Sequence, residues 1–332
     1  MSTTVPPADK TYAEELRGKS LGMMNRACDS FLAGDLKEAA ALWTNEANEG
    51  NSAAMERLAR CFFMGWGVKK DTAQGLKWYK SAAELGDARA MFRLGRFFLN
   101  GTGKVEKDEA KAAEWFTKAA VLGNCDAMHN LGFCYRNDMG VEKDETKAAE
   151  WYAKAADLGS RDAMNSLGVF YRNGTAVEKD DAKAVELFTK AVELGNLEAM
   201  SNLGCCFLNG TGVEKNEPTA VELFTKAAEL GNPVAMNNLG LCFGHGTGVE
   251  MNKTEAAEWY TKAAELGNIS AMRSLAKCYR YGKGMEKNDA KAAEWKKKAE
   301  KRPRYVFGPS AVKGEAKATK RHHTSSRKRK RS

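Results

Sequence analysis

The sequence has no long apolar run and no leader of the kind that directs secretion. A membrane-spanning helix needs about 18 or more consecutive apolar residues, and no stretch of this chain approaches that length. The opening residues, MSTTVPPADKTYAEELRGKS, lack the apolar segment of a secretory signal. We therefore expect a soluble, unsecreted protein without a membrane partner, and a disordered segment over residues 1–20.

The chain is also poor in the patterns on which catalysis and metal binding depend. Its four histidines are His129, His245, His322 and His323, and none stands in a set with a nucleophile and an orienting acid. There is no CxxC pair and no cluster of cysteine and histidine at zinc spacing. The sequence therefore predicts no catalytic residue, no cofactor and no metal, and a protein that is not an enzyme.

What the chain does contain is one unit, repeated. The unit is clearest at residues 199–232, AMSNLGCCFLNGTGVEKNEPTAVELFTKAAELGN. Its first alanine recurs at steps of 36 residues, with a single step of 37 that we assign to an extra residue at Lys104. Self-similarity at a fixed period of this size is typical of stacked repeat arrays. The recurring alanines are Ala54, Ala90, Ala127, Ala163, Ala199, Ala235 and Ala271.

Each unit predicts two helices joined by a glycine-rich loop. Asn196 and Asn216 stand where a short polar side chain would cap the first and second helices. The loop NGTGVEKN supplies two glycines for a turn, and the ending Leu230–Gly231 fits a left-handed glycine at a helix C-terminus. A small residue at a fixed position in the first helix, Gly204 in this unit, predicts close approach of a neighbouring helix.

The pattern A-M-x-x-L-G…G-x-G-V…A-x-x-[WL]-[YF]-x-K-A-A-x-L-G resembles the Sel1-like repeat family, a relative of the tetratricopeptide repeat. The resemblance implies an all-α, right-handed α-solenoid of helix–loop–helix repeats that serves as a protein-interaction adaptor or scaffold. It also allows a role in ubiquitin-linked protein turnover. On this basis residues 21–53 are a degenerate N-terminal capping repeat, 54–302 are seven repeats, and 303–332 are a basic, disordered tail.

Cysteine and tryptophan occupy fixed repeat positions that packing explains. Five cysteines stand six residues after a repeat methionine, and phenylalanine takes that position in the other two units. A site that accepts either residue is a packing site, and unpaired cysteines fit a reducing intracellular compartment. Five tryptophans share one second-helix position with leucine, which predicts a core position. The cysteines are Cys61, Cys134, Cys206, Cys242 and Cys278, and the tryptophans are Trp78, Trp115, Trp151, Trp259 and Trp295.

The face of the first helices opposite the core is the predicted partner-binding groove. At about 100° per residue from the repeat methionine, positions +3, +4 and +7 face the core, while +1, +2, +5 and +9 form one stripe on the other side. First helices line the concave face of such solenoids. The repeat methionines, from which these positions are counted, are Met55, Met91, Met128, Met164, Met200, Met236 and Met272.

This stripe has the character of a peptide-binding surface. Position +5 is apolar or soft in the middle units, and asparagine recurs at positions +2 and +9. Asparagine can donate to and accept from a peptide backbone, while the apolar row receives alternate side chains. The alternative is that these are ordinary surface and helix-end residues. The predicted groove residues are Arg57, Arg93, Asn130, Phe133, Asn137, Val169, Asn173, Asn202, Asn209, Asn238 and Leu241.

Positive charge is concentrated in the C-terminal tail. Residues 296–332 contain 15 Lys or Arg against two Glu, a net of +13, so the rest of a +9 chain carries 9 minus 13, or −4. The run Arg327, Lys328, Arg329, Lys330 and Arg331 resembles a nuclear-import signal, which predicts an import receptor as a partner and the nucleus as the location. Two alternatives remain: the tail contacts RNA or DNA phosphates, or it is a solvated end of a cytoplasmic protein.

Overall fold

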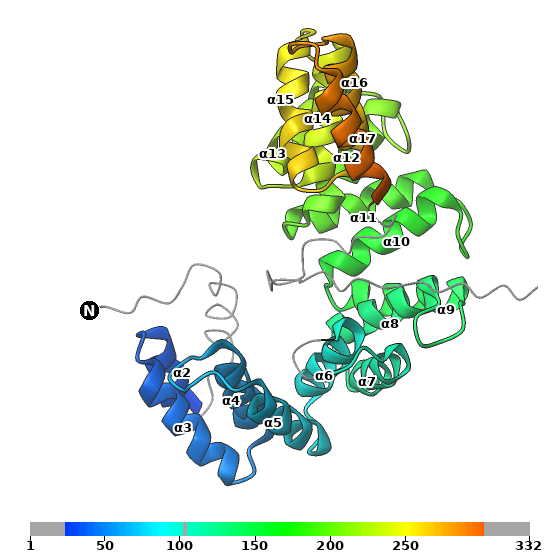
Figure 1. Ribbon diagram of the computed structural model, residues 1–332. Coiled ribbons are helices and arrows are strands. Elements are labelled where there is room, and N and C mark those ends of the chain that lie inside the picture. The colour runs from blue at the N-terminus through cyan, green and yellow to red at the C-terminus, as the bar shows by residue number, and fades with distance from the viewer. Residues whose placement is uncertain (1–23, 102–104, 302–332) are drawn as a thin grey trace, which may run out of the picture.

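The computed structural model describes residues 24–101 and 105–301, and these residues form sixteen helices and no strand. Helices α2 (Met24–Leu32) and α3 (Leu36–Asn48) form a leading pair, and the other fourteen helices follow as seven pairs (Figure 1). The predicted all-α solenoid is confirmed. The predicted disordered ends and the import cluster lie outside the described residues.

Every helix of the seven pairs is thirteen residues long. The first helices are α4 (Ser52–Met64), α6 (Ala88–Asn100), α8 (Cys125–Asn137), α10 (Arg161–Asn173), α12 (Leu197–Asn209), α14 (Pro233–His245) and α16 (Ile269–Tyr281). The second helices are α5 (Thr72–Glu84), α7 (Glu109–Val121), α9 (Glu145–Asp157), α11 (Asp181–Glu193), α13 (Glu217–Glu229), α15 (Lys253–Glu265) and α17 (Asp289–Lys301).

The helices begin and end where the sequence predicts. The side-chain oxygen of Asn196 accepts a hydrogen bond from the backbone N–H of Ala199 at 2.6 Å, which caps α12. After α13, Gly231 has a φ of +89° and its N–H donates to the carbonyl of Ala228 at 2.9 Å. Equivalent caps and left-handed glycines recur along the array. Local chemistry therefore fixes the length of each helix.

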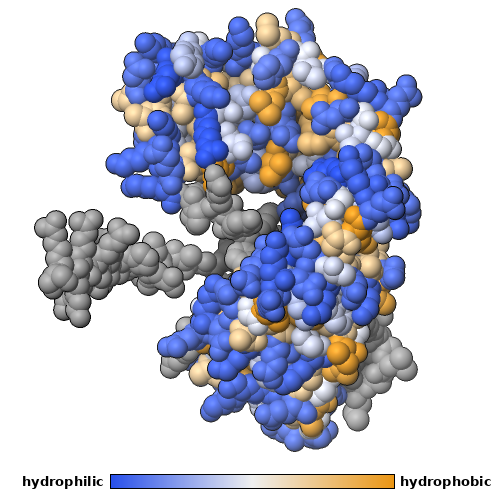
Figure 2. All heavy atoms as spheres, turned by 90° about the vertical axis from the view of Figure 1, so that its right-hand side faces the viewer, coloured by the Kyte–Doolittle hydropathy of each residue, from blue (hydrophilic) through white to orange (hydrophobic). Residues whose placement is uncertain are grey.

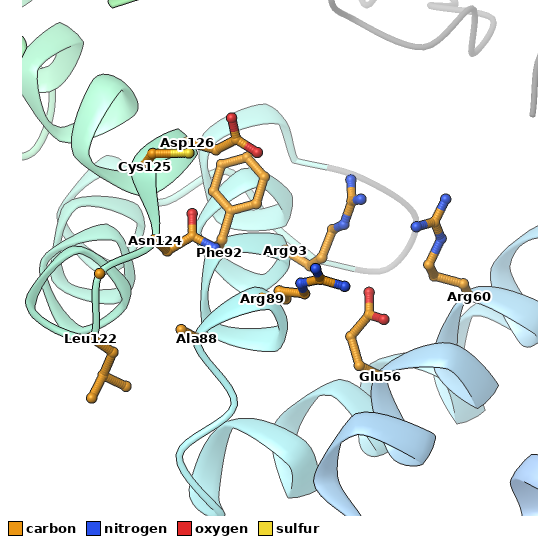
Figure 3. A pocket seen from close by; sticks show the side chains of 11 residues that line it. Glu56, Arg60, Ala88, Arg89, Phe92, Arg93, Leu122, Asn124, Cys125 and Asp126 are labelled. Carbon is orange, nitrogen blue, oxygen red and sulfur yellow. The ribbon is translucent and has the colours of Figure 1, made fainter. Parts of the chain in front are cut away.

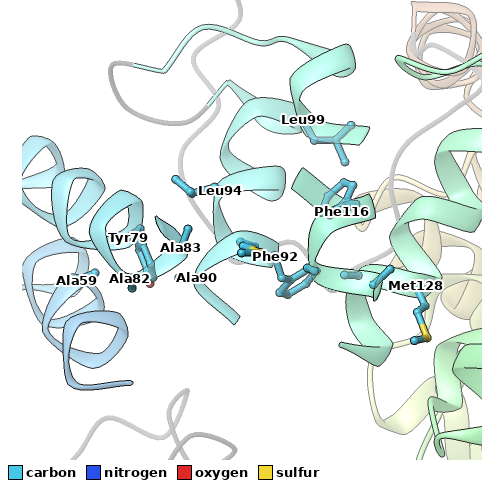
Figure 4. Packing of buried hydrophobic residues seen from close by; sticks show 14 of the residues in the cluster. Ala59, Tyr79, Ala82, Ala83, Ala90, Phe92, Leu94, Leu99, Phe116 and Met128 are labelled. Atoms are coloured by element: carbon cyan, nitrogen blue, oxygen red, sulfur yellow. The ribbon is translucent and has the colours of Figure 1, made fainter. Parts of the chain in front are cut away.

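The two helices of a unit pack closely because the first carries a glycine where the second carries an aromatic ring. A Cβ atom added to Gly132 would lie 2.8 Å from Cε1 of Tyr152, a ring that is fully buried. In the preceding helix pair, α6 and α7, the equivalent ring is Phe116, which is also fully buried (Figure 4). The predicted close approach at the small residue is confirmed. The other such pairs are Gly95–Phe116, Gly168–Phe188, Gly204–Phe224 and Gly240–Tyr260.

The tryptophan position is not the core position that the sequence predicts. Trp151 is half-buried, whereas Tyr152, the next residue, is fully buried against α8. The outer face of the Trp151 ring carries the ammonium of Lys154, whose Nζ lies 4.4 Å from the ring centroid. Lysine lies over tryptophan in the same way in α7, α15 and α17. A helix rotates by about 100° per residue, so only one of two adjacent aromatic residues can face the partner helix.

The repeat cysteines are core residues, as predicted. Cys61, Cys134 and Cys206 are at most 1% exposed, and all eight cysteines of the chain are free thiols. Burial raises the pKa of the Cys61 thiol to about 12, so this thiol stays protonated and unreactive at neutral pH.

Neighbouring units stack into a curved array. The second helix of each unit packs against the first helix of the next, as α13 does against α14, and the first helices α12 and α14 also contact each other. In Figure 1, α7 and α9 lie on the outer side of the bend, and α6 and α8 lie on the side that faces its opening. The space-filling view shows a mostly hydrophilic surface with small, scattered apolar patches (Figure 2). Over this middle part of the array, the first helices therefore lie on the inner side.

Two glycines of α14 give a matched test of this packing. A Cβ atom on Gly240 would lie 2.7 Å from the ring of Tyr260, whereas one on Gly244 would find its nearest neighbour at 3.6 Å. We expect Gly240→Ala to lower the free energy of unfolding by about 1–3 kcal/mol through overpacking. Gly244→Ala should raise it by about 0.5–1 kcal/mol through helix propensity. Urea unfolding followed by circular dichroism measures both, and equal effects of the two substitutions would contradict this packing.

Candidate functional site

The predicted groove residues lie on the first helices of the first six units, α4 to α14, and all but one reach the surface. We call positions +2, +5 and +9 of α4 to α16 the inner stripe. Asn173 and Asn209 are exposed, and Leu241 is 39% exposed. The half-buried members are Arg93, Asn130, Phe133, Asn137, Val169, Asn202 and Asn238. Side-chain contacts join α8 to α10, α10 to α12 and α12 to α14, so these residues form a continuous surface from α8 to α14.

An apolar row runs along the middle of the inner stripe. Phe133, Val169, Cys205 and Leu241 occupy the same position in four consecutive first helices, and none is buried in the core. The core sites of these helices are filled by other residues, such as Leu131 and its counterparts in the other units. Val169 and Cys205 also pack in part against core residues, whereas Leu241 is 39% exposed. The row therefore offers apolar surface that the core covers only in part.

Three of the predicted asparagines bond to their own helices. Asn130 Nδ2 donates to the carbonyl of Asp126 at 2.7 Å, and Asn137 Nδ2 donates to the carbonyl of Phe133 at 2.9 Å. Asn209 does the same to Cys205 at 2.9 Å. This bond holds each side chain in place, and an amide held in this way can still accept a hydrogen bond from a peptide N–H.

Asn202 and Asn238 link neighbouring units instead of only facing outwards. Asn202 Nδ2 donates to Asn165 Oδ1 at 2.8 Å, and Arg172 Nη1 donates to Asn202 Oδ1 at 3.2 Å, so α12 is joined to α10. Asn238 Nδ2 lies 3.5 Å from the sulfur of Cys205 on α12. Both residues have a structural role that the sequence alone does not show.

Position +1 lies at the junction between units, although helical geometry places it on the exposed side. Phe92, Ser201 and Asn237 are at most 7% exposed at this position. His129 belongs to the same row, and its Nε2 lies 3.2 Å from Ser166 Oγ on the next first helix. The stripe available to a partner is accordingly narrower than predicted, because the neighbouring unit covers one edge.

Arg57 does not line an open surface. It is 4% exposed at the junction between the leading pair and α4. Burial raises the pKa of the nearby Glu46 carboxyl, and the positive charge of Arg57 partly offsets that rise. The leading pair covers the position that is accessible in later units, which is why the repeat pattern misplaces this residue.

The N-terminal end of the inner stripe opens into a cavity of about 440 Å³ between α4, α6 and α8. Arg60, Arg89 and Arg93 direct their guanidinium groups into it, with Glu56 among them and Phe92 and Asp126 on the far wall (Figure 3). Arg89 is absent from the predicted groove residues. The sequence could have identified Arg89, because it stands at position −2, about 160° around the helix from the repeat methionine and so within the stripe.

The described residues contain no group of three or more His, Cys, Asp or Glu placed to hold a metal ion. Within the same ranges, no helix is long and apolar enough to cross a membrane.

Seven consecutive segments of the chain match the Sel1 repeat: residues 52–87, 88–124, 125–160, 161–196, 197–232, 233–268 and 269–302. The chain belongs to the Sel1 repeat family. The resemblance carried by its repeat pattern is thus confirmed. Sel1 repeat solenoids generally mediate protein–protein interaction, and this scaffold family is generally non-catalytic.

Solved Sel1 structures share the architecture. A Sel1 repeat protein from Oxalobacter formigenes is 32% identical with a TM-score of 0.67, over 73% of this chain and 99% of that one. A protective antigen of uropathogenic Escherichia coli is 31% identical with a TM-score of 0.63, over 79% of this chain and 56% of that one. Chitin synthase regulatory factor 3 of Schizosaccharomyces pombe is 40% identical over 67 residues, 20% of this chain but only 7% of that protein. This chain thus spans a small part of that relative.

Asn202 and Asn173 allow the linking role to be separated from a surface role. We expect Asn202→Ala to lower the free energy of unfolding by about 1 kcal/mol, because Asn165 and Arg172 lose a shared partner. Asn173 is exposed at the end of α10, so Asn173→Ala should change stability by less than about 0.5 kcal/mol. Urea unfolding of both variants measures the two effects. An unchanged unfolding midpoint for Asn202→Ala would contradict the linking role of Asn202.

Proposed function

We propose that this Sel1 repeat protein is a non-catalytic adaptor that binds an extended peptide segment of a partner protein along its inner stripe. The observation that carries the proposal is the apolar row Phe133, Val169, Cys205 and Leu241, which recurs in four units at positions that are half-buried or exposed. Asparagines flank this row on both sides, at positions +2 and +9. Apolar contacts between polar groups that bond a peptide backbone are a common mode of peptide recognition.

The spacing of the row refines the kind of peptide. Packed helices lie about 8–10 Å apart, so one apolar residue of the row follows another at about that distance. Alternate side chains of a β-strand repeat every ~6.7 Å, which is too short. A polyproline II segment rises about 3.1 Å per residue with three residues per turn, so every third side chain repeats at ~9.3 Å. A partner with an apolar residue at every third position therefore fits better than one with alternate apolar residues.

Selection from a displayed random peptide library tests this function. Peptides selected on the intact chain should have apolar residues three apart, and Leu241→Asp should weaken their binding about tenfold or more by placing a charge in the row. Val121→Asp is the control, since Val121 is 74% exposed at the end of the second helix α7. Isothermal titration of the purified variants gives the affinities. Equal loss in both variants, or no selected peptide, would contradict the proposal.

We also propose that the adaptor acts in the nucleus, with the cluster Arg327–Arg331 as the segment that an import receptor binds. The support is compositional: there are five consecutive basic residues in a chain whose residues 1–295 carry a net charge of −4. The same charge would attract nucleic acid, and that contact is the competing role of the tail.

Fluorescence microscopy of a tandem fluorescent-protein fusion separates these roles. With Arg327–Arg331 replaced by alanine, we expect the fusion to move from the nucleus to the cytoplasm. Replacing Lys296, Lys297 and Lys298 of α17 by alanine is the control and should leave it nuclear. A cluster variant that stays nuclear would contradict the import role. If it also loses salt-sensitive RNA binding, the nucleic-acid role is favoured instead.

A further inference from the structure

The cavity between α4, α6 and α8 differs in charge from the rest of the array. Arg60, Arg89 and Arg93 line it, and Arg96 stands one turn further along α6. Two carboxylates, Glu56 and Asp126, face these four arginines. The positive excess is local, because residues 1–295 as a whole carry a net charge of −4. The N-terminal end of the inner stripe therefore carries a concentration of positive charge that the average over residues 1–295 does not show.

Aromatic rings hold the arginines in position. The guanidinium of Arg60 lies 5.8 Å from the ring centroid of Trp66, and those of Arg93 and Arg96 lie 5.8 and 5.9 Å from that of Phe92. A guanidinium stacked on a ring has already lost much of its rotamer freedom, so less entropy is lost when it binds an anion. These arginines are therefore prepared for a ligand in a way that a flexible surface lysine is not.

The positive charges of neighbouring arginines also repel one another. Burial and the nearby charge of Arg93 lower the pKa of the Arg96 guanidinium, and Asp126 only partly opposes this. A further anion in the cavity would relieve the repulsion between Arg93 and Arg96. The planar guanidinium forms two parallel hydrogen bonds to a carboxylate, which gives geometric preference as well as charge attraction.

The extent of the basic surface favours a peptide over a nucleic acid. The corresponding positions of the next two units are Asn130, Phe133, Ser166 and Val169, which are uncharged. A nucleic-acid strand carries a phosphate at every nucleotide and would need positive charge to continue along its path. At positions +2 and +5 the positive charge stops after α6, the apolar row occupies α8 to α14, and charge returns at Lys277 of α16. That order suits a chain in which acidic residues precede or follow apolar ones.

We propose that this cavity binds the aspartate and glutamate side chains of an acidic peptide segment, adjacent to the apolar residues that the inner stripe receives. The inference rests on the proposed peptide-binding function and adds the chemistry of one end of the peptide. It identifies Arg60, Arg89 and Arg93 as residues that determine specificity for a negatively charged partner.

Fluorescence anisotropy with a labelled peptide of glutamate and serine tests the site, and the same peptide with glutamine for glutamate is its control. In the intact chain we expect the glutamate peptide to bind more tightly and to weaken as salt rises. Arg60→Gln with Arg93→Gln should reduce its affinity about tenfold or more. Arg273→Gln with Lys277→Gln removes two exposed charges from the corresponding face of α16 and should leave it unchanged. All proteins in this comparison, the intact reference included, also carry alanine at Arg327–Arg331, which lowers the background binding of the acidic peptide to the tail.

Arg60→Lys with Arg93→Lys guards against a folding artefact. It keeps the charge but loses the paired geometry, so its affinity should fall between the intact chain and the glutamine variant, with an unchanged circular dichroism spectrum. Equal affinity of the intact chain and the glutamine variant would overturn the site. The site would also be overturned if the glutamine variant bound single-stranded RNA more weakly than the intact chain but bound the acidic peptide equally well.

The two proposals fail separately. Acidic-peptide binding that needs Arg60 and Arg93 but survives Leu241→Asp supports the basic cavity even if the apolar row has no role. If the selected peptides bind more weakly to the Leu241→Asp variant but equally well to the arginine variants, this inference is overturned and the peptide-binding function is supported.

Discussion

An aromatic ring lying directly on the backbone of a glycine sets the geometry of each central repeat. The ring of Tyr152 occupies the space where a side chain at Gly132 would be, and the same contact recurs in the neighbouring units. It fixes the separation and rotation of the two helices, and so determines which residues of the first helix face inwards. Each unit then stacks on the next through alanine, leucine and cysteine sites that are almost fully buried. In a repeat array the stability of the whole is approximately the sum of such local contacts.

This geometry leaves one face of the first helices only partly engaged in the fold, although Asn202 and Asn238 on that face bond to the neighbouring unit. The core uses one side of each helix, and the junction between units uses position +1, through contacts such as that between His129 and Ser166. What remains is the inner stripe, whose chemistry changes along the array. It is basic around α4 and α6, and apolar with flanking asparagines from α8 to α14. Because the units are nearly identical in backbone, this change in side chains is what can distinguish one partner from another.

Most of the fold was predictable from the sequence, because the period, the caps and the glycines act within a single unit. The caps at Asn196 and the left-handed Gly231 follow from a few adjacent residues. The site was only partly predictable. A helical wheel assigns faces relative to the helix's own partner, so it could not show that the leading pair buries Arg57, nor that Asn202 bonds to α10. It also could not choose between Trp151 and Tyr152, which are both aromatic and adjacent.

The central claim is that partners bind to the first helices, on the inner side of the array. Photo-crosslinking tests it most directly: a selected peptide carrying a photoreactive residue is bound to the intact chain, irradiated, and the attachment sites are identified by mass spectrometry. The account predicts attachment within α4, α6, α8, α10, α12 and α14, at or beside the inner stripe. Attachment confined to the second helices or to the tail after Lys301 would contradict it.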